Sequence, residues 1–230
     1  MTGQPLTLAG ASLTARPSGA LFWPAEGLLC VADLHLCKSE RLARRGGTLL
    51  PPYETAETLD RLAAEIAALA PARVVCLGDS FDDCAAGEAL AAADAARLTA
   101  LMAGRDWVWI AGNHDPGPLA LGGRHLAALS LGPLTFRHEA RRDACAGEVS
   151  GHFHPKLRLP VRGGAVTRPC FLADPTRIIL PAFGAYTGGL GTGHPLFAAL
   201  LGPGARAVLT GDPCVAVPFR TGDPALTGHA

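Results

Sequence analysis

The 230-residue sequence lacks several features that would assign it to a class at once. No run of about 18 consecutive apolar residues is present, which excludes a membrane-spanning helix. No basic residue precedes Arg16 and no apolar run with a cleavage signature follows, so we expect no signal peptide. The seven cysteines form no Cys-x-x-Cys pair, which argues against a disulfide framework or a thiolate zinc site. These absences favour a reduced, cytoplasmic protein.

Net charge is also lacking, because 20 acidic residues balance 20 basic ones. Proteins that hold nucleic acid mainly by electrostatics are usually strongly basic, so any such contact here must be local. Hydrophobic residues make up 49% of the chain, which excludes wholesale disorder. A chain of this length can build one sufficient core. We therefore expect a single domain over residues 1–230, with a loose tail over residues 221–230.

The first half of the chain alternates between short apolar runs and helical patterns. Apolar runs over residues 27–32, 73–77 and 107–110 are typical of strands buried on both faces. Residues 53–70 carry apolar side chains at helical spacing, and an alanine-rich helix is expected over about 85–103. This order of elements predicts right-handed crossovers and a mostly parallel sheet.

The second half has a different pattern, in which helical periodicity fades and short apolar runs are separated by glycine and proline. We expect strands over residues 131–136, 148–150, 157–161, 170–173, 177–180 and 206–209. They would form a second sheet packed on the first. The fold class expected from both halves is α/β, a two-sheet β-sandwich flanked by helices.

Five expected strand ends are followed by side chains that bind metals. These side chains are Asp33 and His35, Asp79, Asn113 with His114 and Asp115, His138, and His152 with His154. Ligand sites in α/β sheets lie outside the carboxyl ends of strands, so these groups should converge. Residues i and i+2 of an extended chain point to the same side, which would aim each Asp-x-His or His-x-His pair at one point. Carboxylate, amide and imidazole groups together suit divalent metals.

Each block alone has an ordinary alternative. Asp-x-His occurs by chance, Gly-Asn-His-Asp suits a polar turn, and a lone histidine such as His138 is commonly a partly buried surface residue. The ordered set, with each block at a strand end, favours a metal site.

The ordered set resembles the calcineurin-like metallophosphoesterases, whose blocks are Asp-x-His, Gly-Asp-x-x-Asp, Gly-Asn-His-Asp/Glu, His and Gly-His-x-His. All five occur in that order between residues 33 and 154. The resemblance implies the αββα metallophosphoesterase fold and a centre of two divalent metal ions. It implies that one metal is held by Asp33, His35, Asp79 and His154, and the other by Asp79, Asn113, His138 and His152.

A closer resemblance, over nearly the whole chain, is to the PdeM-type subfamily of ligase-associated DNA damage response endonucleases. It is carried by Lys38 after the first block, by Pro155 after the last, and by residues 180–184 and 187–189. It implies a bacterial, manganese-dependent phosphodiesterase or nuclease encoded near an ATP-dependent DNA ligase. We expect a DNA endonuclease of DNA repair that uses Mn²⁺, with Zn²⁺, Fe²⁺ or Mg²⁺ as alternative ions.

In such a site, a hydroxide that bridges the two metals would attack the phosphodiester. His114 would stabilise charge in the transition state or protonate the departing oxygen, and Asp115 would orient His114. Asp82 and Asp83 would either hydrogen-bond metal ligands or cap the following helix.

Lys38, Arg41 and Arg44 are the expected substrate contacts, because this basic segment follows the first block. The alternative is a solvated helix face with ordinary salt bridges. The glycine-rich segment over residues 184–193 would either rim the site, with Tyr186 as a stacking platform, or serve as a connection.

Three other functions compete with a nuclease. Gly78-Asp79-Ser80 imitates the nucleophile block of Gly-Asp-Ser hydrolases, but a late Asp-x-x-His is missing. A binding protein on the same scaffold would be expected to lose metal ligands, which are all present. The strongest rival is a small-molecule phosphatase or nucleotide pyrophosphatase on the same centre.

Overall fold

The computed structural model describes residues 3–47, 50–83, 85, 90–115, 117 and 121–219, and the expected tail lies outside them. The first sheet has seven strands in the order β1-β2-β3-β4-β5-β6-β7. They are Gln4–Leu8, Ala11–Ala15, Leu21–Trp23, Leu28–Val31, Arg73–Cys76, Asp106–Ile110 and Arg124–Leu126. The first four strands are antiparallel neighbours, whereas β4 to β7 are parallel.

The second sheet follows the order β15-β14-β12-β13-β10-β9-β8, and β11 pairs with β12 outside this path. In chain order β8 to β15 are Ala128–Leu131, Leu134–Arg137, Glu148–Ser150, Lys156–Val161, Gly164–Ala173, Arg177–Ile179, Arg206–Leu209 and Val215–Pro218. The central strand β10 is parallel to both β9 and β13. Its carboxyl end therefore points the same way as that of β9, which brings the polar segments after both strands to one edge.

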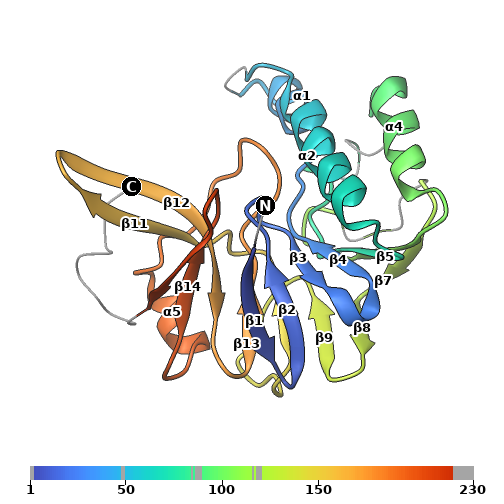
Figure 1. Ribbon diagram of the computed structural model, residues 1–230. Helices are drawn as coiled ribbons and strands as arrows, with labels where there is room; N and C mark the ends of the chain where they lie inside the picture. The colour runs from blue at the N-terminus through green and yellow to red at the C-terminus, as the bar shows by residue number, and fades with distance from the viewer. Residues whose placement is uncertain are drawn as a thin grey trace.

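Helices cover the outer face of each sheet. On the first sheet lie α2 (Glu54–Leu69) and α4 (Ala92–Met102), and α1 (Lys38–Arg44) lies beside α2, as Figure 1 shows. A short helix, α5 (Pro195–Leu200), packs on the second sheet, and the 3-10 turn η1 (Pro24–Glu26) joins β3 to β4. The helix α2 forms because Leu59, Leu62 and Ile66 recur on one buried face.

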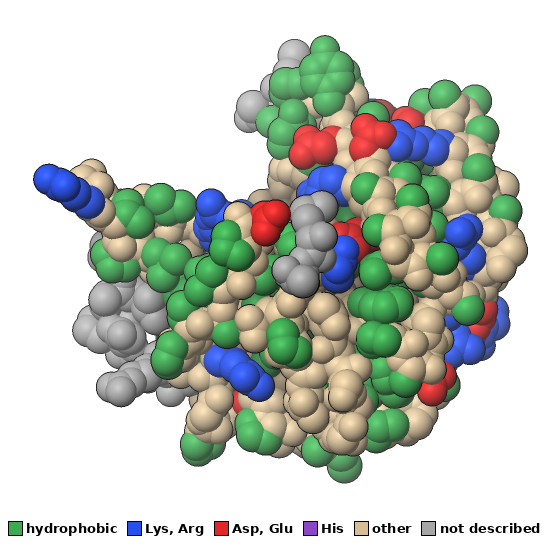
Figure 2. All heavy atoms as spheres, in the orientation of Figure 1, with side chains coloured by type: hydrophobic (Ala, Val, Ile, Leu, Met, Phe, Trp, Pro, Cys, Tyr) green, Lys and Arg blue, Asp and Glu red, His purple; other side chains and the backbone are tan. Residues whose placement is uncertain are grey.

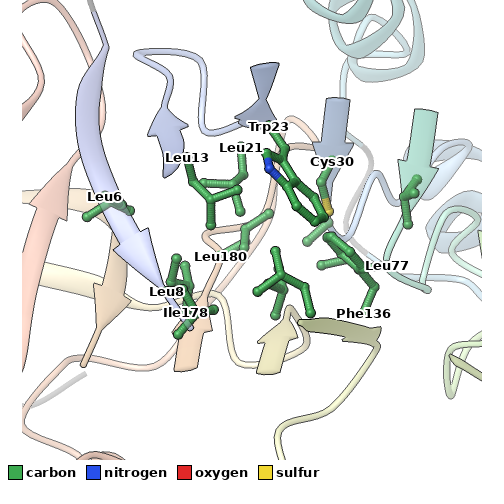
Figure 3. Packing of buried hydrophobic residues seen from close by; sticks show 14 of the residues in the cluster. Leu6, Leu8, Leu13, Leu21, Trp23, Cys30, Leu77, Phe136, Ile178 and Leu180 are labelled. Carbon is green, nitrogen blue, oxygen red and sulfur yellow. The ribbon is translucent and has the colours of Figure 1, made fainter. Parts of the chain in front are cut away.

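The core between the sheets follows from the pleat of the strands. Successive side chains of a strand point to opposite faces. Cys30 on β4 and Val75 on β5 therefore enter the core between the sheets, whereas their neighbours Leu29 and Val74 pack under the helices. Figure 3 shows the central core, where Phe136 of the second sheet packs among residues of the first. Burial on both faces explains why these strands are continuously apolar in sequence.

The expected fold class is confirmed, and the three strands expected in the first half correspond to β4, β5 and β6. Several features differ from expectation: β7, β15 and α5 were not predicted, and the expected strand over residues 131–136 is divided between β8 and β9. The N-terminal strands β1 to β3 were not predicted, β12 begins at residue 164 instead of 170, and α4 spans only 92–102 of the expected helix. Residues 86–89 of that expected helix lie outside the described residues. Among the described helices, none combines the length and hydropathy required to cross a membrane.

Candidate metal centre

Seven candidate ligands lie in the segments that follow β4, β5, β6, β9 and β10, and these segments meet where the edges of the two sheets converge. We call this group of side chains the metal centre: Asp33, His35, Asp79, Asn113, His138, His152 and His154. The approach is so close that glycine is required at its joints. A Cβ atom on Gly78 would lie 2.6 Å from Nδ1 of His138, and one on Gly151 would lie 2.6 Å from Oδ2 of Asp33.

The backbone at the metal centre is left-handed, which corrects the extended conformation that we expected for the paired blocks. Five of the ligand candidates have a positive φ: 53° at Asp33, 45° at His35, 45° at Asp79, 71° at His152 and 45° at His154. Such conformations cost on the order of 1–3 kcal/mol each and concentrate at functional sites. The side chains converge because the chain turns sharply at each ligand, and not because a straight strand presents alternate residues.

One cluster consists of Asp33, His35 and His154, whose ligand atoms lie within 4.8 Å of one another. Oδ2 of Asp33 accepts the backbone N–H of His152 at 2.9 Å, and Nδ1 of His35 lies 2.7 Å from Oδ1 of Asp82. The remaining atoms, Asp33 Oδ1, His35 Nε2 and His154 Nε2, are buried and have no hydrogen-bond partner among the described residues. Buried polar atoms without partners are costly, so three that face a common point fit a bound metal ion.

A second cluster consists of Asp79, His138 and His152, again within 4.8 Å of one another. Nδ1 of His138 donates to the Leu77 carbonyl oxygen at 2.7 Å, which leaves Nε2 as the free nitrogen of a neutral ring. That Nε2 lies 2.9 Å from Asn113 Oδ1, 2.9 Å from His152 Nδ1 and 3.4 Å from Asp79 Oδ2. At such short distances, a hydrogen or a metal ion must lie between these oxygen and nitrogen lone pairs.

Without a metal, a proton on His138 satisfies this second cluster. Burial lowers the pKa of His138, but the carboxylates of Asp79 and Asp33 outweigh burial and raise it to about 9. Burial raises the pKa of Asp79, but hydrogen bonding and charge from His138 outweigh it and lower the pKa to about 2. The pKa of His152 is lowered by its own burial and by the charge of His138. The donor set thus holds a positive charge even with the protein atoms alone.

Asp82 holds a ligand from behind, in agreement with the first of the two roles considered for it. Its Oδ1 lies 2.7 Å from Nδ1 of His35, and its Oδ2 accepts Nε of Arg41. Because His35 then donates through Nδ1, its Nε2 lone pair is directed to the first cluster. Asp83 does not repeat this role, since its carboxylate pairs with Arg44 and Arg45.

Asp115 contacts different atoms from those we expected. Its buried carboxylate accepts the backbone N–H groups of Asp79, Ser80 and Phe81 at 2.9, 2.7 and 3.1 Å. Burial raises the pKa of Asp115 to about 6, against the lowering effect of these donors. Asp115 therefore fixes the turn that carries Asp79. The expected orienting contact on His114 comes instead from the Asp82 carbonyl oxygen, 2.8 Å from Nδ1 of His114.

The basic segment after the first block is largely engaged in ion pairs. Arg41 pairs with Asp82, and Nε of Arg44 lies 2.6 Å from Glu40. These contacts favour the ordinary salt-bridge alternative for Arg44. Lys38, the first residue of α1, lies close enough to Lys156 for its charge to lower the pKa of Lys156, after the larger effect of burial.

The segment over residues 183–190 rims the metal centre. Gly184 donates its N–H to the Asp33 carbonyl oxygen at 3.0 Å, and a Cβ atom on Gly189 would lie 2.1 Å from the carbonyl oxygen of His154. Tyr186, at the tip, has a φ of 57° and is 41% exposed. Glycines that follow an apolar run were the available signal for this packing, but the sequence did not reveal which loops they contact.

Comparison with known proteins identifies the chemistry of this arrangement. A family model described as calcineurin-like phosphoesterase matches residues 28–161, from β4 to the end of β11, and this span includes every candidate ligand. The chain belongs to the calcineurin-like phosphoesterase family. The resemblance inferred from the five sequence blocks is thereby confirmed, and the protein is a metal-dependent phosphoesterase.

A solved structure supports the assignment over nearly the whole length of the phosphoesterase. The crystal structure of Pseudomonas putida nuclease MPE is similar with a TM-score of 0.72 and 29% sequence identity, over 94% of this chain and 100% of that one. No curated protein matches the chain.

The Gly-Asp-Ser alternative loses support, because Ser80 is only 1% exposed and its hydroxyl lies away from solvent.

Proposed function

We propose that this phosphoesterase is a DNA endonuclease of DNA repair that hydrolyses phosphodiester bonds at a centre of two divalent metals. The observation that carries the proposal is the pair of adjacent clusters, joined where Nδ1 of His138 lies 3.8 Å from Oδ1 of Asp33. Nucleic acid as the substrate is supported by the full-length similarity to a Pseudomonas nuclease. A functional link to an ATP-dependent DNA ligase and a cytoplasmic location are part of the same proposal.

Each cluster would hold one ion. Asp33, His35 and His154 would hold the first, and Asn113, His138 and His152 the second, with Asp79 contributing to both. Bound divalent metals supply an activated water and neutralise charge that develops on phosphate oxygens. The mixed oxygen and imidazole donors suit Mn²⁺, which we propose as the ion, with Zn²⁺, Fe²⁺ and Mg²⁺ as competitors.

His114 would act on the departing oxygen. Its Nδ1 is engaged with the Asp82 carbonyl oxygen at 2.8 Å, which requires a hydrogen on Nδ1. A proton on Nε2 then makes the ring cationic, and this proton can be given to the leaving group or can stabilise charge beside it. Asp115 supports the reaction indirectly, because it fixes the turn over residues 79–81 through three backbone hydrogen bonds.

A second candidate function is a small-molecule phosphatase or nucleotide pyrophosphatase on the same centre. It is favoured by the ion pairs of Arg41 and Arg44, which leave fewer free cations beside the metal centre for a polymer. Of the substrate contacts proposed in α1, Lys38 keeps the strongest case, because no acidic side chain among the described residues pairs with it.

The proposal is tested by a substrate panel with Mn²⁺. We expect hydrolysis of bis-p-nitrophenyl phosphate and of single-stranded or duplex DNA, and slow hydrolysis of p-nitrophenyl phosphate. Closed circular DNA in the panel separates internal cleavage from digestion at ends. Activity on the monoester alone would overturn the nuclease and leave the phosphoesterase, whereas inertness toward every ester with each of the four ions would contradict both.

A further inference from the structure

A two-stranded arm projects from the second sheet beside the metal centre. We define the arm as residues 156–169, in which β11 and the first part of β12 form six cross-strand pairs from Lys156–Pro169 to Val161–Gly164. Every residue from 160 to 168 is exposed, so both faces of the outer ribbon meet solvent. Figure 2 shows the molecule hollowed between the arm and the helix layer. The outer ribbon therefore contributes little to the hydrophobic core.

The arm is rigidly attached despite this exposure. β12 continues beyond the arm into the second sheet, where residues 170–173 are buried and pair with both β13 and β14. At the root, Nζ of Lys156 donates to the Thr187 carbonyl oxygen at 2.9 Å, and the backbone N–H of Lys156 donates to Leu190 at 2.9 Å. The turn is compact, with Gly163 at a φ of 90°, where glycine is favoured. The base of the arm thus keeps a fixed position relative to the metal centre.

Charge on the arm is of one sign in a chain whose net charge is zero. The arm contains Lys156, Arg158, Arg162 and Arg168, and the sequence has no acidic residue between Glu148 and Asp174. Elsewhere arginines are commonly paired, as in Arg16–Glu65 and Arg97–Asp60. Within the described chain, no ion pair includes Arg158 or Arg162. Blue side chains at the outer end of the arm are visible in Figure 2.

The arm begins next to the metal centre in the chain. β11 begins two residues after His154 of the metal centre, so the arm leads directly away from that centre. The five steps from Lys156 to Val161 span about 17 Å at ~3.3 Å per residue. That length corresponds to about five phosphates along one strand of a duplex at ~3.4 Å per nucleotide. Guanidinium groups bind phosphate oxygens through paired hydrogen bonds, and a β-ribbon is narrow enough to lie along a nucleic-acid groove.

We infer that the arm is a docking surface for the phosphate backbone of the nucleic acid whose scissile phosphate lies in the metal centre. Arg158 and Arg162 contact phosphates several nucleotides from the cleaved bond. The inference rests on the proposed function, which supplies the substrate. It adds the surface of the protein that binds this substrate. A zero net charge then does not prevent polymer binding, because this one element carries four cations and no acidic residue.

An alternative is that these arginines only protect an exposed strand edge from aggregation, a common use of charged residues there. Such a role does not account for Val161 and Val166, which are 48% and 43% exposed on the same ribbon. It also makes a different prediction, since any charge or polar group would serve. The experiment must therefore separate binding from solubility.

The test uses the Mn²⁺-loaded full chain and the double variant Arg158→Ala/Arg162→Ala. Binding to a fluorescein-labelled phosphorothioate (dT)20 is followed by anisotropy, and hydrolysis of bis-p-nitrophenyl phosphate is followed in parallel. With about 0.7 counterion released per phosphate contact, each arginine is worth about eightfold in affinity at 50 mM salt. We expect a loss of about 60-fold, a salt slope lower by about 1.4, and turnover of the small diester within twofold of the parent.

Two matched variants complete the test. Arg97→Ala/Arg206→Ala removes the same charge away from the arm, since Arg206 pairs with Ala173 at the far end of β12, and we expect less than threefold loss. Arg158→Lys/Arg162→Lys should retain most of the binding and the salt slope. Equal affinities of the arm variant and the distant control would contradict the arm as a docking surface and would leave the nuclease proposal unaffected. A failure of the parent to hydrolyse diesters would instead contradict the proposed function, while anisotropy would still report on the arm.

A last measurement uses anionic vesicles. Sedimentation with vesicles of phosphatidylserine and phosphatidylcholine tests whether the cations serve a lipid surface. We expect no binding that depends on Arg158 and Arg162. Vesicle binding lost in the double variant, with (dT)20 affinity unchanged, would overturn the nucleic-acid assignment.

Discussion

The metal centre and the arm lie next to each other in the chain but are built in opposite ways. The metal centre is largely buried at Asp33, His35, Asp79 and His138, with Asn113 at the surface. It has a left-handed backbone at five ligands and surrounds converging lone pairs with supporting contacts. The arm is exposed and regular, and its outer cations lack acidic partners among the described residues. Precise placement within a low-dielectric pocket serves chemistry, whereas unpaired charge on a fixed ribbon serves recognition of a polymer. Substitutions in the metal centre should therefore abolish hydrolysis without abolishing binding of nucleic acid, and substitutions in the arm should do the reverse.

The largest effect is expected from Asp79→Asn. The substitution keeps the shape of the side chain but removes the negative charge that pairs with His138, 3.4 Å away, and that we propose as a metal ligand. Hydrolysis of every diester should fall below detection, and metal content measured by inductively coupled plasma mass spectrometry should drop. Binding of (dT)20 through the arm should persist. Full activity of this variant would contradict the two-metal assignment.

His114→Ala should lower turnover by about 10²–10⁴-fold, the usual contribution of a general acid. The ring is held by the Asp82 carbonyl oxygen and is not among the proposed ligands, so metal content should remain that of the parent. Steady-state rates with bis-p-nitrophenyl phosphate and metal analysis of the same sample provide the comparison. Loss of metal together with activity would show instead that His114 is a ligand.

Asp82→Asn should weaken metal binding by about 10–100-fold, because Asp82 fixes the ring of His35 through Nδ1 at 2.7 Å. The neighbouring Asp83→Asn is a matched control, since Asp83 pairs with Arg44 and Arg45 instead. Mn²⁺ titrations of both variants give the comparison. Equal affinities would remove Asp82 from the supporting contacts of the metal centre.

Mn²⁺ binding should become tighter by up to about tenfold per pH unit between pH 7 and 9. In the metal-free protein the pKa of His138 is raised to about 9, so below that pH a proton competes with the metal. The same shift stabilises the metal-free fold, fully below pH ~6.5, and this stabilisation is lost as the pH rises through about 9. Calorimetric titrations in buffers of different ionisation enthalpy should show proton release. An affinity independent of pH over this range would exclude His138 as a titrating ligand.

Ser80→Ala is expected to have the smallest effect, with rates within about twofold of the parent. Ser80 is 1% exposed, and its backbone N–H is held by Asp115 at 2.7 Å, so its hydroxyl is not placed as a nucleophile. A loss as large as that of His114→Ala would revive the acyl-transfer alternative.

The sequence predicted which residues form the metal centre better than it predicted their geometry. Strands β4, β5 and β6 are buried on both faces, which makes them continuous apolar runs and marks their ends. The left-handed φ at residues such as Asp33 and His152 was not predictable, because aspartate and histidine are enriched in this conformation but still adopt it at only a small share of their positions. The contacts of Asp115 also escaped prediction, since backbone N–H groups at residues 79–81 carry no side-chain signal.

The same physical reasons explain the missed elements. β1 alternates Leu6 and Leu8 with polar residues, a period-two signal that was present but is weaker than a continuous run. The helix α5 has six residues, too few to show helical periodicity. The arm begins within an expected strand, but its outer half is Gly-, Pro- and Arg-rich and exposed, so burial left no pattern there.

Anomalous diffraction from Mn²⁺-soaked crystals, recorded near the manganese absorption edge, measures the central claim most directly. The account predicts two peaks per chain, one among Asp33, His35 and His154 and the other among Asn113, His138 and His152, with Asp79 near both. A single peak, or peaks outside these two clusters, would contradict it.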